Sequence, residues 1–173
     1  MQRARRGDTG TKRRILGIDP GSRATGYGVI ESEGGNHTFV VCGVIRTSSK
    51  LSFPERLKEI YTGVCEVIEA QKPDVAAVED VFVSVNPRSA LKLGHARGVA
   101  MLAAIVHGLP VYEYTPTNVK QSIAGYGQAG KEQVQQMVRV LLQLSSSPSQ
   151  DAADALAVAI CHANQSFYPT AES

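Results

Sequence analysis

The sequence predicts a single α/β domain built on one mixed, five-stranded sheet with helices on both faces. Near the start, three extended segments follow one another through short Gly-rich turns, the pattern of an antiparallel meander. Further on, short apolar strands alternate with helical patterns, which favours parallel strands with helices packed on the sheet. The 173 residues, 43% of them hydrophobic, suit one domain with a sizeable core.

The meander is predicted over three segments, the first of which is the most informative. Residues 15–19 contain no polar side chain before Asp19, as expected for a strand buried on both faces. Extended patterns resume at residues 26–31 and 38–45, and Glu33-Gly34-Gly35-Asn36 between them is a turn signal.

A helix and a strand follow the meander. Ser52 and Glu55 have the spacing of a capping box, and apolar residues then recur at helical spacing until Pro73. Residues 74–79 form a short apolar strand that ends in Glu79. The first strand ends in a carboxylate in the same way, so right-handed connections would place the two acids close together.

The remaining elements alternate in the same manner. A long helix rich in small residues is expected from Pro87 to Val106, a strand at 109–114, a short helix from Thr115 to Gly125 and an amphipathic helix from Lys131. A final helix is expected to begin at Pro148, because Ser147 and Gln150 have capping-box spacing, and to end near Asn164.

Charge and composition divide the chain into a basic extension (1–14), one domain (15–164) and a frayed tail (165–173). The extension carries six basic residues and one acidic residue, shows no periodicity and is expected to be disordered. Residues 84–131 hold five basic side chains against one acidic one, which suits a polyanion-binding surface and equally suits ordinary solvated faces.

The same composition predicts a cytoplasmic protein without a membrane span or a secretory signal. No uninterrupted apolar run reaches the roughly 20 residues that a span needs, and no apolar segment follows the basic N-terminus. The three cysteines, Cys42, Cys65 and Cys161, have no metal-type spacing and are expected to be reduced core residues.

Four carboxylates form the candidate site. Asp19 and Glu79 end adjacent core strands, while Asp151 and Asp154 lie three residues apart on one face of the final helix. Each signal alone has an ordinary explanation, a capped turn or a solvated helix face. Four converging acids, however, repel one another unless hard cations such as Mg²⁺ or Mn²⁺ are bound. Two such ions activate water and stabilise a leaving oxygen, so the pattern points to phosphodiester hydrolysis.

Several long motifs resemble those of the bacterial RuvC Holliday junction resolvases. They are residues 15–30 (ILGIDPGSRATGYGVI), 78–82 (VEDVF), 89–100 (SALKLGHARGVA) and 151–157 (DAADALA), in the family's order and spacing. The resemblance covers about residues 15–162. It implies a ribonuclease-H-like fold, a homodimer, and metal-dependent symmetric cutting of four-way DNA junctions in recombination and repair. Association with the RuvA and RuvB branch-migration proteins is implied in the same way.

The resemblance also assigns individual residues. It maps the catalytic and metal-binding acids onto Asp19, Glu79, Asp151 and Asp154, although some members have His at the last position. It maps a base-stacking aromatic onto Phe82 and two functional lysines onto Lys120 and Lys131, the latter beside the scissile phosphate. Further basic residues on the long helix are weaker candidates for DNA contacts: Arg88, Lys92 and Arg97.

Three alternatives remain open at this stage. An ATP-binding protein of the actin and sugar-kinase type also opens with a strand, an Asp and a Gly-rich turn, but it needs a second related domain and a bound nucleotide. A non-catalytic binder of DNA structures would not need all four acids. Another ribonuclease-H-like nuclease, acting on RNA–DNA hybrids, would share the metal site but not the junction specificity implied for Phe82.

Overall fold

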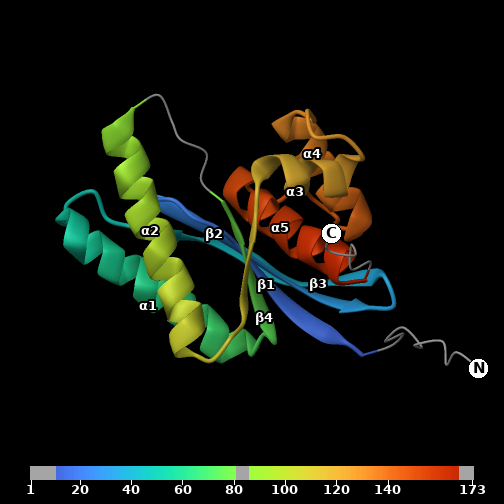
Figure 1. Cartoon of the computed structure of the whole chain (residues 1–173), viewed down its shortest axis with the longest axis horizontal. Coiled ribbons are helices and arrows are strands. Elements are labelled where there is room, and N and C mark those ends of the chain that lie inside the picture. Colours follow the sequence, from blue (N-terminus) through green and yellow to red (C-terminus); the bar gives the residue numbers. More distant parts are fainter. Residues whose placement is uncertain (1–10, 81–85, 168–173) are drawn as a thin grey trace, which may run out of the picture.

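A five-stranded mixed sheet in the order β3-β2-β1-β4-β5 organises the chain (Figure 1). The structure is a computed structural model that describes residues 11–80 and 86–167. The strands are β1 (Arg13–Asp19), β2 (Ala24–Glu33), β3 (Asn36–Arg46), β4 (Val75–Glu79) and β5 (Val111–Tyr114). The helices are α1 (Phe53–Gln71), α2 (Pro87–Val106), α3 (Pro116–Ala124), α4 (Lys131–Leu141) and α5 (Gln150–Phe167).

The first three strands form the predicted antiparallel meander. β1 pairs with β2, and β2 with β3. The β2–β3 hairpin turns at Gly34 and Gly35, whose φ values are +57° and +84°. Two successive positive φ values match the right-handed twist of the flanking strands, and glycine adopts them without steric strain.

The other two strands run parallel to β1, and this direction creates the site. β4 pairs with β1 so that Val78 lies beside Ile18, and β5 pairs with β4 so that Tyr114 lies beside Glu79. Parallel neighbours end at the same edge of a sheet. The carboxylates that follow Ile18 and Val78, Asp19 and Glu79, therefore leave the sheet side by side, as predicted.

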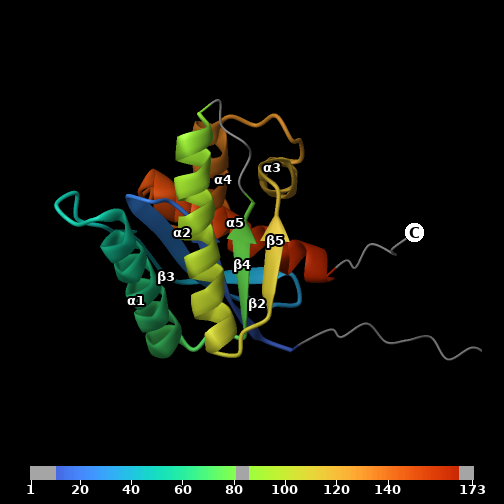
Figure 2. The same cartoon turned by 60° about the vertical axis from the view of Figure 1, so that its left-hand side comes forward.

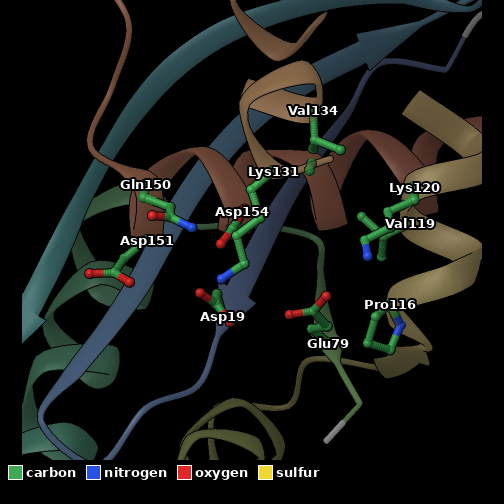
Figure 3. Close-up of a pocket in the computed structure, with 11 residues that line it drawn as sticks. Asp19, Glu79, Pro116, Val119, Lys120, Lys131, Val134, Gln150, Asp151 and Asp154 are labelled. Carbon is green, nitrogen blue, oxygen red and sulfur yellow. The ribbon is translucent and has the colours of Figure 1, made fainter. Parts of the chain in front are cut away.

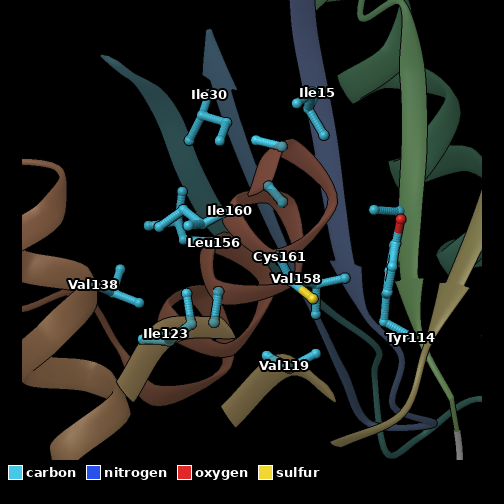
Figure 4. Packing of buried hydrophobic residues seen from close by; sticks show 14 of the residues in the cluster. Ile15, Ile30, Tyr114, Val119, Ile123, Val138, Leu156, Val158, Ile160 and Cys161 are labelled. Atoms are coloured by element: carbon cyan, nitrogen blue, oxygen red, sulfur yellow. The ribbon is translucent and has the colours of Figure 1, made fainter. Parts of the chain in front are cut away.

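Each face of the sheet has its own apolar core. Ile15 of β1 packs with α3, α4 and α5 in the cluster of Figure 4, whereas Leu16 and Ile18 pack with α1 and α2 on the opposite face. Figures 1 and 2 show the two layers of helices with the sheet between them. The alternation of side chains along β1 thus confirms the prediction of a strand buried on both faces.

Three boundaries differ from the sequence predictions. β1 begins at Arg13, inside the expected disordered extension, because Arg14 donates to Glu31 of β2 and to the Gln71 carbonyl. α5 begins at Gln150 rather than Pro148, since the first turn closes with the Ala153 amide donating to the Ser149 carbonyl. α5 also continues to Phe167, beyond the expected end. Residues 1–10 and 168–173 lie outside the described residues.

Helix α2 is long and apolar, with 20 residues. By length and composition it meets the criterion for a membrane span, as core helices of soluble proteins also do, and within the described segments no other helix does. Here α2 packs through buried Ala96, Ala100 and Ala103 into the core that it shares with α1. All three cysteines are free, as predicted, and Cys161 is buried.

Candidate active site

Glycines in β1 and β2 bring α5 into direct contact with the sheet backbone. A Cβ atom built on Gly17 would lie 2.0 Å from the Ala155 carbonyl oxygen, and one on Gly26 would lie 2.0 Å from the Asp151 carbonyl oxygen. Neither distance is possible for a real side chain, so only glycine permits this approach. Because Gly26 pairs with Asp19 across the β1–β2 ladder, the first turn of α5 lies beside the end of β1.

The predicted acids and lysines line one pocket of about 390 Å³ at this edge of the sheet (Figure 3). β1 and β4 supply Asp19 and Glu79, and α5 supplies Asp151 and Asp154. Lys120 comes from the middle of α3 and Lys131 is the first residue of α4, and in Figure 3 the Lys131 side chain extends toward Asp19. The other lining residues are Pro116, Val119, Val134, Gln150 and Ala157. Six of the ten residues proposed from the sequence therefore share one pocket.

The surroundings of Asp19 strongly disfavour the charged form of its carboxyl. Burial, which is the largest cause, and the nearby negative charges of Glu79, Asp154 and Asp151 together raise the pKa of its carboxyl to about 8. Asp19 also shares a side-chain hydrogen bond with Glu79, which requires a proton between the two carboxyls. Without a cation, the pair therefore holds a proton at neutral pH.

The pKa values of Glu79 and Asp154 are raised by the same cause and lowered by the lysines. Burial is the main reason that both lie above the ordinary value. Lys131 and Lys120 oppose this effect at both carboxyls by favouring the charged form. The lysines thus partly neutralise an otherwise acidic pocket.

The four carboxylates are not arranged to coordinate one ion together. In Figure 3 the Asp151 carboxylate points away from Asp19 and Glu79, and those two bind each other. Among the described residues, no three Asp, Glu, His or Cys side chains are grouped closely enough to hold a metal ion as they stand. The donor set nevertheless fits a hard cation, because it offers only carboxylate oxygens and a net negative charge.

Side chains from α1 and β2 hold the turn that follows Asp19. Arg56 donates to the Ser22 carbonyl and to the Thr47 hydroxyl, and the Thr25 hydroxyl donates to the Gly21 carbonyl at 2.9 Å. The sequence analysis did not identify these anchors, nor did it find Gln150 at the rim of the pocket. The Arg56 contact with the Ser22 carbonyl joins residues 34 positions apart, so no local pattern marks it.

Of the four remaining DNA-contact candidates, the three that the structure describes do not line the pocket. Phe82 is outside the described residues, so its role stays a prediction. Arg88 and Lys92 are exposed on α2, with the Lys92 ammonium 5.7 Å from the centre of the Phe53 ring. The Arg97 guanidinium contacts the backbone of Glu79 and two carboxylates of the protein itself, and its role toward DNA stays a prediction.

The sheet order is that of a ribonuclease-H-like protein. Carboxylates at the ends of two parallel strands, and on the helix packed against them, give this fold an acidic site. Comparison with known proteins narrows this class. Residues 15–162 match the family model described as crossover junction endodeoxyribonuclease RuvC, and the chain belongs to this family.

Individual relatives agree over most of the chain. Crossover junction endodeoxyribonuclease RuvC of Cupriavidus metallidurans is 57% identical over 151 residues, which span 87% of this chain and 83% of the relative. The protein of the same description from Geotalea uraniireducens is 56% identical over 88% of this chain and 90% of its own. Among solved structures, T. thermophilus RuvC in complex with Holliday junction substrate superposes with a TM-score of 0.82 at 39% identity, covering 87% of this chain and 93% of the other.

Proposed function

We propose that the protein is a structure-specific endonuclease that resolves four-way DNA junctions in homologous recombination and repair. The observation that carries the proposal is the pocket in which Asp19, Glu79 and Asp154 meet Lys120 and Lys131. This is the site expected of a family whose members are described as crossover junction endodeoxyribonucleases, one of them solved with a Holliday junction.

The cofactor is Mg²⁺, two ions per site, with Mn²⁺ able to replace it. Asp19, Glu79, Asp151 and Asp154 would hold the ions through carboxylate oxygens, and no His or Cys lines the pocket. When bound, the metal supplies charge stabilisation and an activated water for phosphodiester hydrolysis. Because binding requires loss of the proton that Asp19 and Glu79 share, metal affinity should rise with pH.

Protein groups contribute charge and orientation. The Lys131 side chain extends into the acidic pocket, where its ammonium can offset the charge that develops on a reacting phosphate. Lys120 faces the same pocket from α3 and would hold a neighbouring phosphate of the same strand. Arg88 and Lys92 would contact the DNA backbone farther out, and Phe82 would stack on an opened base.

Two copies are required for symmetric cutting, and α2 offers the surface for pairing them. Leu91, Gly94, Gly98, Leu102 and Ile105 recur at helical spacing on one exposed stripe, defined here as the α2 stripe. A groove of about 470 Å³ runs along it over the glycines. Exposed leucines beside a glycine groove form a self-complementary surface, as a two-fold dimer needs.

The remaining partners follow from family membership. We expect the enzyme to act in the cytoplasm on junction DNA, together with the RuvA and RuvB branch-migration proteins, and to use no nucleotide cofactor. An ATP-binding test separates this proposal from the kinase-like alternative, because only the latter requires the nucleotide.

The decisive experiment compares a synthetic four-way junction with a linear duplex of matching sequence, each with Mg²⁺, with Mn²⁺ and with EDTA. Paired symmetric nicks in the junction alone, dependent on metal, would support the proposal. Binding without cleavage in either metal would favour a non-catalytic binder. Equal cleavage of the duplex would keep the metal site but remove the junction specificity.

A further inference from the structure

Arg97 of α2 reaches the end of β4, where Glu79 leaves the sheet. Its Nε donates to the backbone oxygen of Glu79 at 3.2 Å. Its Nη2 contacts the Asp80 carboxylate at 3.3 Å and also pairs with the Glu113 carboxylate. Only 16% of the Arg97 side chain is exposed, whereas both carboxylates are about half exposed. The guanidinium is thus directed inward, onto protein acceptors.

These contacts join three elements around one catalytic residue. Glu79 is the last residue of β4 and pairs with Tyr114, the last residue of β5. The Asp80 amide donates to the Tyr114 carbonyl at 2.7 Å and so continues the pairing of the two strands by one residue beyond Glu79. Arg97 adds a bond to each side of this pair: to Glu79, the last residue of β4, and Asp80, which follows it, and to Glu113 on β5.

The arrangement depends on the shape of the guanidinium. Its Nε and Nη2 groups donate from one rigid plane, so a single side chain can hold a backbone carbonyl and a carboxylate in a fixed relative position. A lysine carries the same charge but presents one point donor on a flexible stem. Charge alone therefore does not reproduce this contact.

We propose that Arg97 is a positioning residue for Glu79, rather than a contact to DNA. By holding the Glu79 carbonyl and the strand end that follows, it fixes the direction in which the Glu79 carboxylate enters the pocket. This inference rests on the proposed function, because it gives Glu79 a place in catalysis. It also links the pocket to α2, the helix that carries the α2 stripe.

The test compares Arg97→Lys and Arg97→Met with the wild type and with Arg88→Met, which alters an exposed arginine of the same helix. Four quantities are measured: the single-turnover cleavage rate at saturating enzyme with Mg²⁺, junction affinity in EDTA, thermal unfolding, and hydrogen exchange of the backbone at 76–80 in metal-free protein. The last three do not depend on the loaded enzyme.

Both Arg97 variants should cleave at least about 10-fold more slowly, since a displacement near 1 Å in an active site costs up to about 100-fold in rate. Their junction affinity should stay within about twofold of the wild type, and exchange at the Asp80 amide should accelerate. Arg88→Met, which removes a proposed phosphate contact, should instead weaken junction binding and leave exchange at the Asp80 amide as in the wild type.

Other results would overturn the inference. If Arg97→Lys cleaves like the wild type, or if binding weakens while the saturating rate is kept, Arg97 is a phosphate contact. If Arg97→Met fails to fold, the test uses the cleavage rates of Arg97→Lys and Glu113→Gln instead. Wild-type cleavage rates in both of these variants would reject the positioning role. A wild type that does not cut junctions refutes the proposed function instead, and hydrogen exchange then still shows whether Arg97 holds the strand end.

Discussion

The Cα atom of Gly26 lies against the backbone of Asp151 so closely that a Cβ atom there would fall 2.0 Å from the Asp151 carbonyl oxygen. Gly26 is also the ladder partner of Asp19. One glycine therefore sets the spacing between a strand-end carboxylate and the first turn of the helix that supplies two more. The site depends on this contact between backbones as much as on the acids themselves.

Gly26→Ala should push α5 away from the sheet. We expect a loss of about 1–3 kcal/mol in the free energy of unfolding, the usual effect of overpacking, together with a severe loss of cleavage. Urea unfolding and the junction assay measure the two effects. Gly130→Ala is the matched control for stability, because Gly130 has φ −70° and no heavy atom within 4 Å of a built Cβ. Equal stability of the two variants would contradict the predicted clash.

Asp19→Asn should abolish cleavage while leaving junction binding largely intact, because it removes a charged ligand but adds no bulk at the strand end. Gel-shift and cleavage assays with the same junction measure the two properties. Magnesium provides a second readout: it should raise the unfolding temperature of the wild type more than that of the variant. Cleavage by the variant at a near wild-type rate would remove Asp19 from the site.

The same substitution should change how stability depends on pH in metal-free protein. The unfolded chain releases the Asp19 proton near its ordinary pKa of 3.8, whereas the folded protein keeps it to about pH 8. Between these values the folded state binds more protons, so wild-type stability falls as pH rises. Asn carries no titrating proton. Urea unfolding in EDTA measures the free energy of unfolding of both proteins at pH 4 and at pH 8. We expect the value for Asp19→Asn, relative to that of the wild type, to rise by at least about 1.4 kcal/mol from pH 4 to pH 8. A difference that does not change with pH would contradict this account.

Lys131→Met should slow cleavage by about 100-fold or more, the effect of removing a charge-stabilising donor from an active site. The Lys131 ammonium lowers the pKa values of Glu79 and Asp154, so its loss should raise both. The acid limb of the pH–rate profile should then move to higher pH. Lys58→Met, at an exposed position of α1, serves as the control. An unshifted profile would show that Lys131 does not act on these carboxylates.

Leu102→Glu should prevent dimer formation by placing a charge on the α2 stripe, where a second copy would bury it. Sedimentation of the variant should give the monomer mass at concentrations at which the wild type is dimeric. Val140→Glu is the control, because Val140 of α4 is 62% exposed and Leu102 is 54% exposed. If both variants sediment like the wild type, the α2 stripe is not the dimer contact.

Phe82→Ala should impair cutting more than binding. Loss of the stacking contact would remove about 1–3 kcal/mol of stabilisation from the opened junction, which is the form that is cleaved. The comparison is the single-turnover rate against the dissociation constant, both with the same junction, and a 2-aminopurine base at the junction centre reports stacking directly. Equal cleavage by the two proteins would assign Phe82 to the apolar core.

Local chemistry in the sequence determined the elements and the identity of the acids. The apolar run before Asp19, the capping residues Ser52 and Glu55, and the Gly34-Gly35 turn act within a few residues, so their outcome can be predicted without the fold. The Asp-x-x-Asp pair on α5 follows from helical periodicity in the same way. The resemblance to the resolvases added Lys120 and Lys131, which lie outside the shared motifs and whose surroundings in the sequence look ordinary.

Only the tertiary structure decided how these groups meet. Gly17 and Gly26 become essential because α5 lies on them, and Arg97 contacts three acceptors near the ends of β4 and β5: the Glu79 carbonyl and the Asp80 and Glu113 carboxylates. The raised pKa of Asp19 likewise requires burial beside three other acids. Each of these properties depends on contacts between residues far apart in the chain. Steric fit and electrostatics act over distances in space, which a linear sequence does not contain.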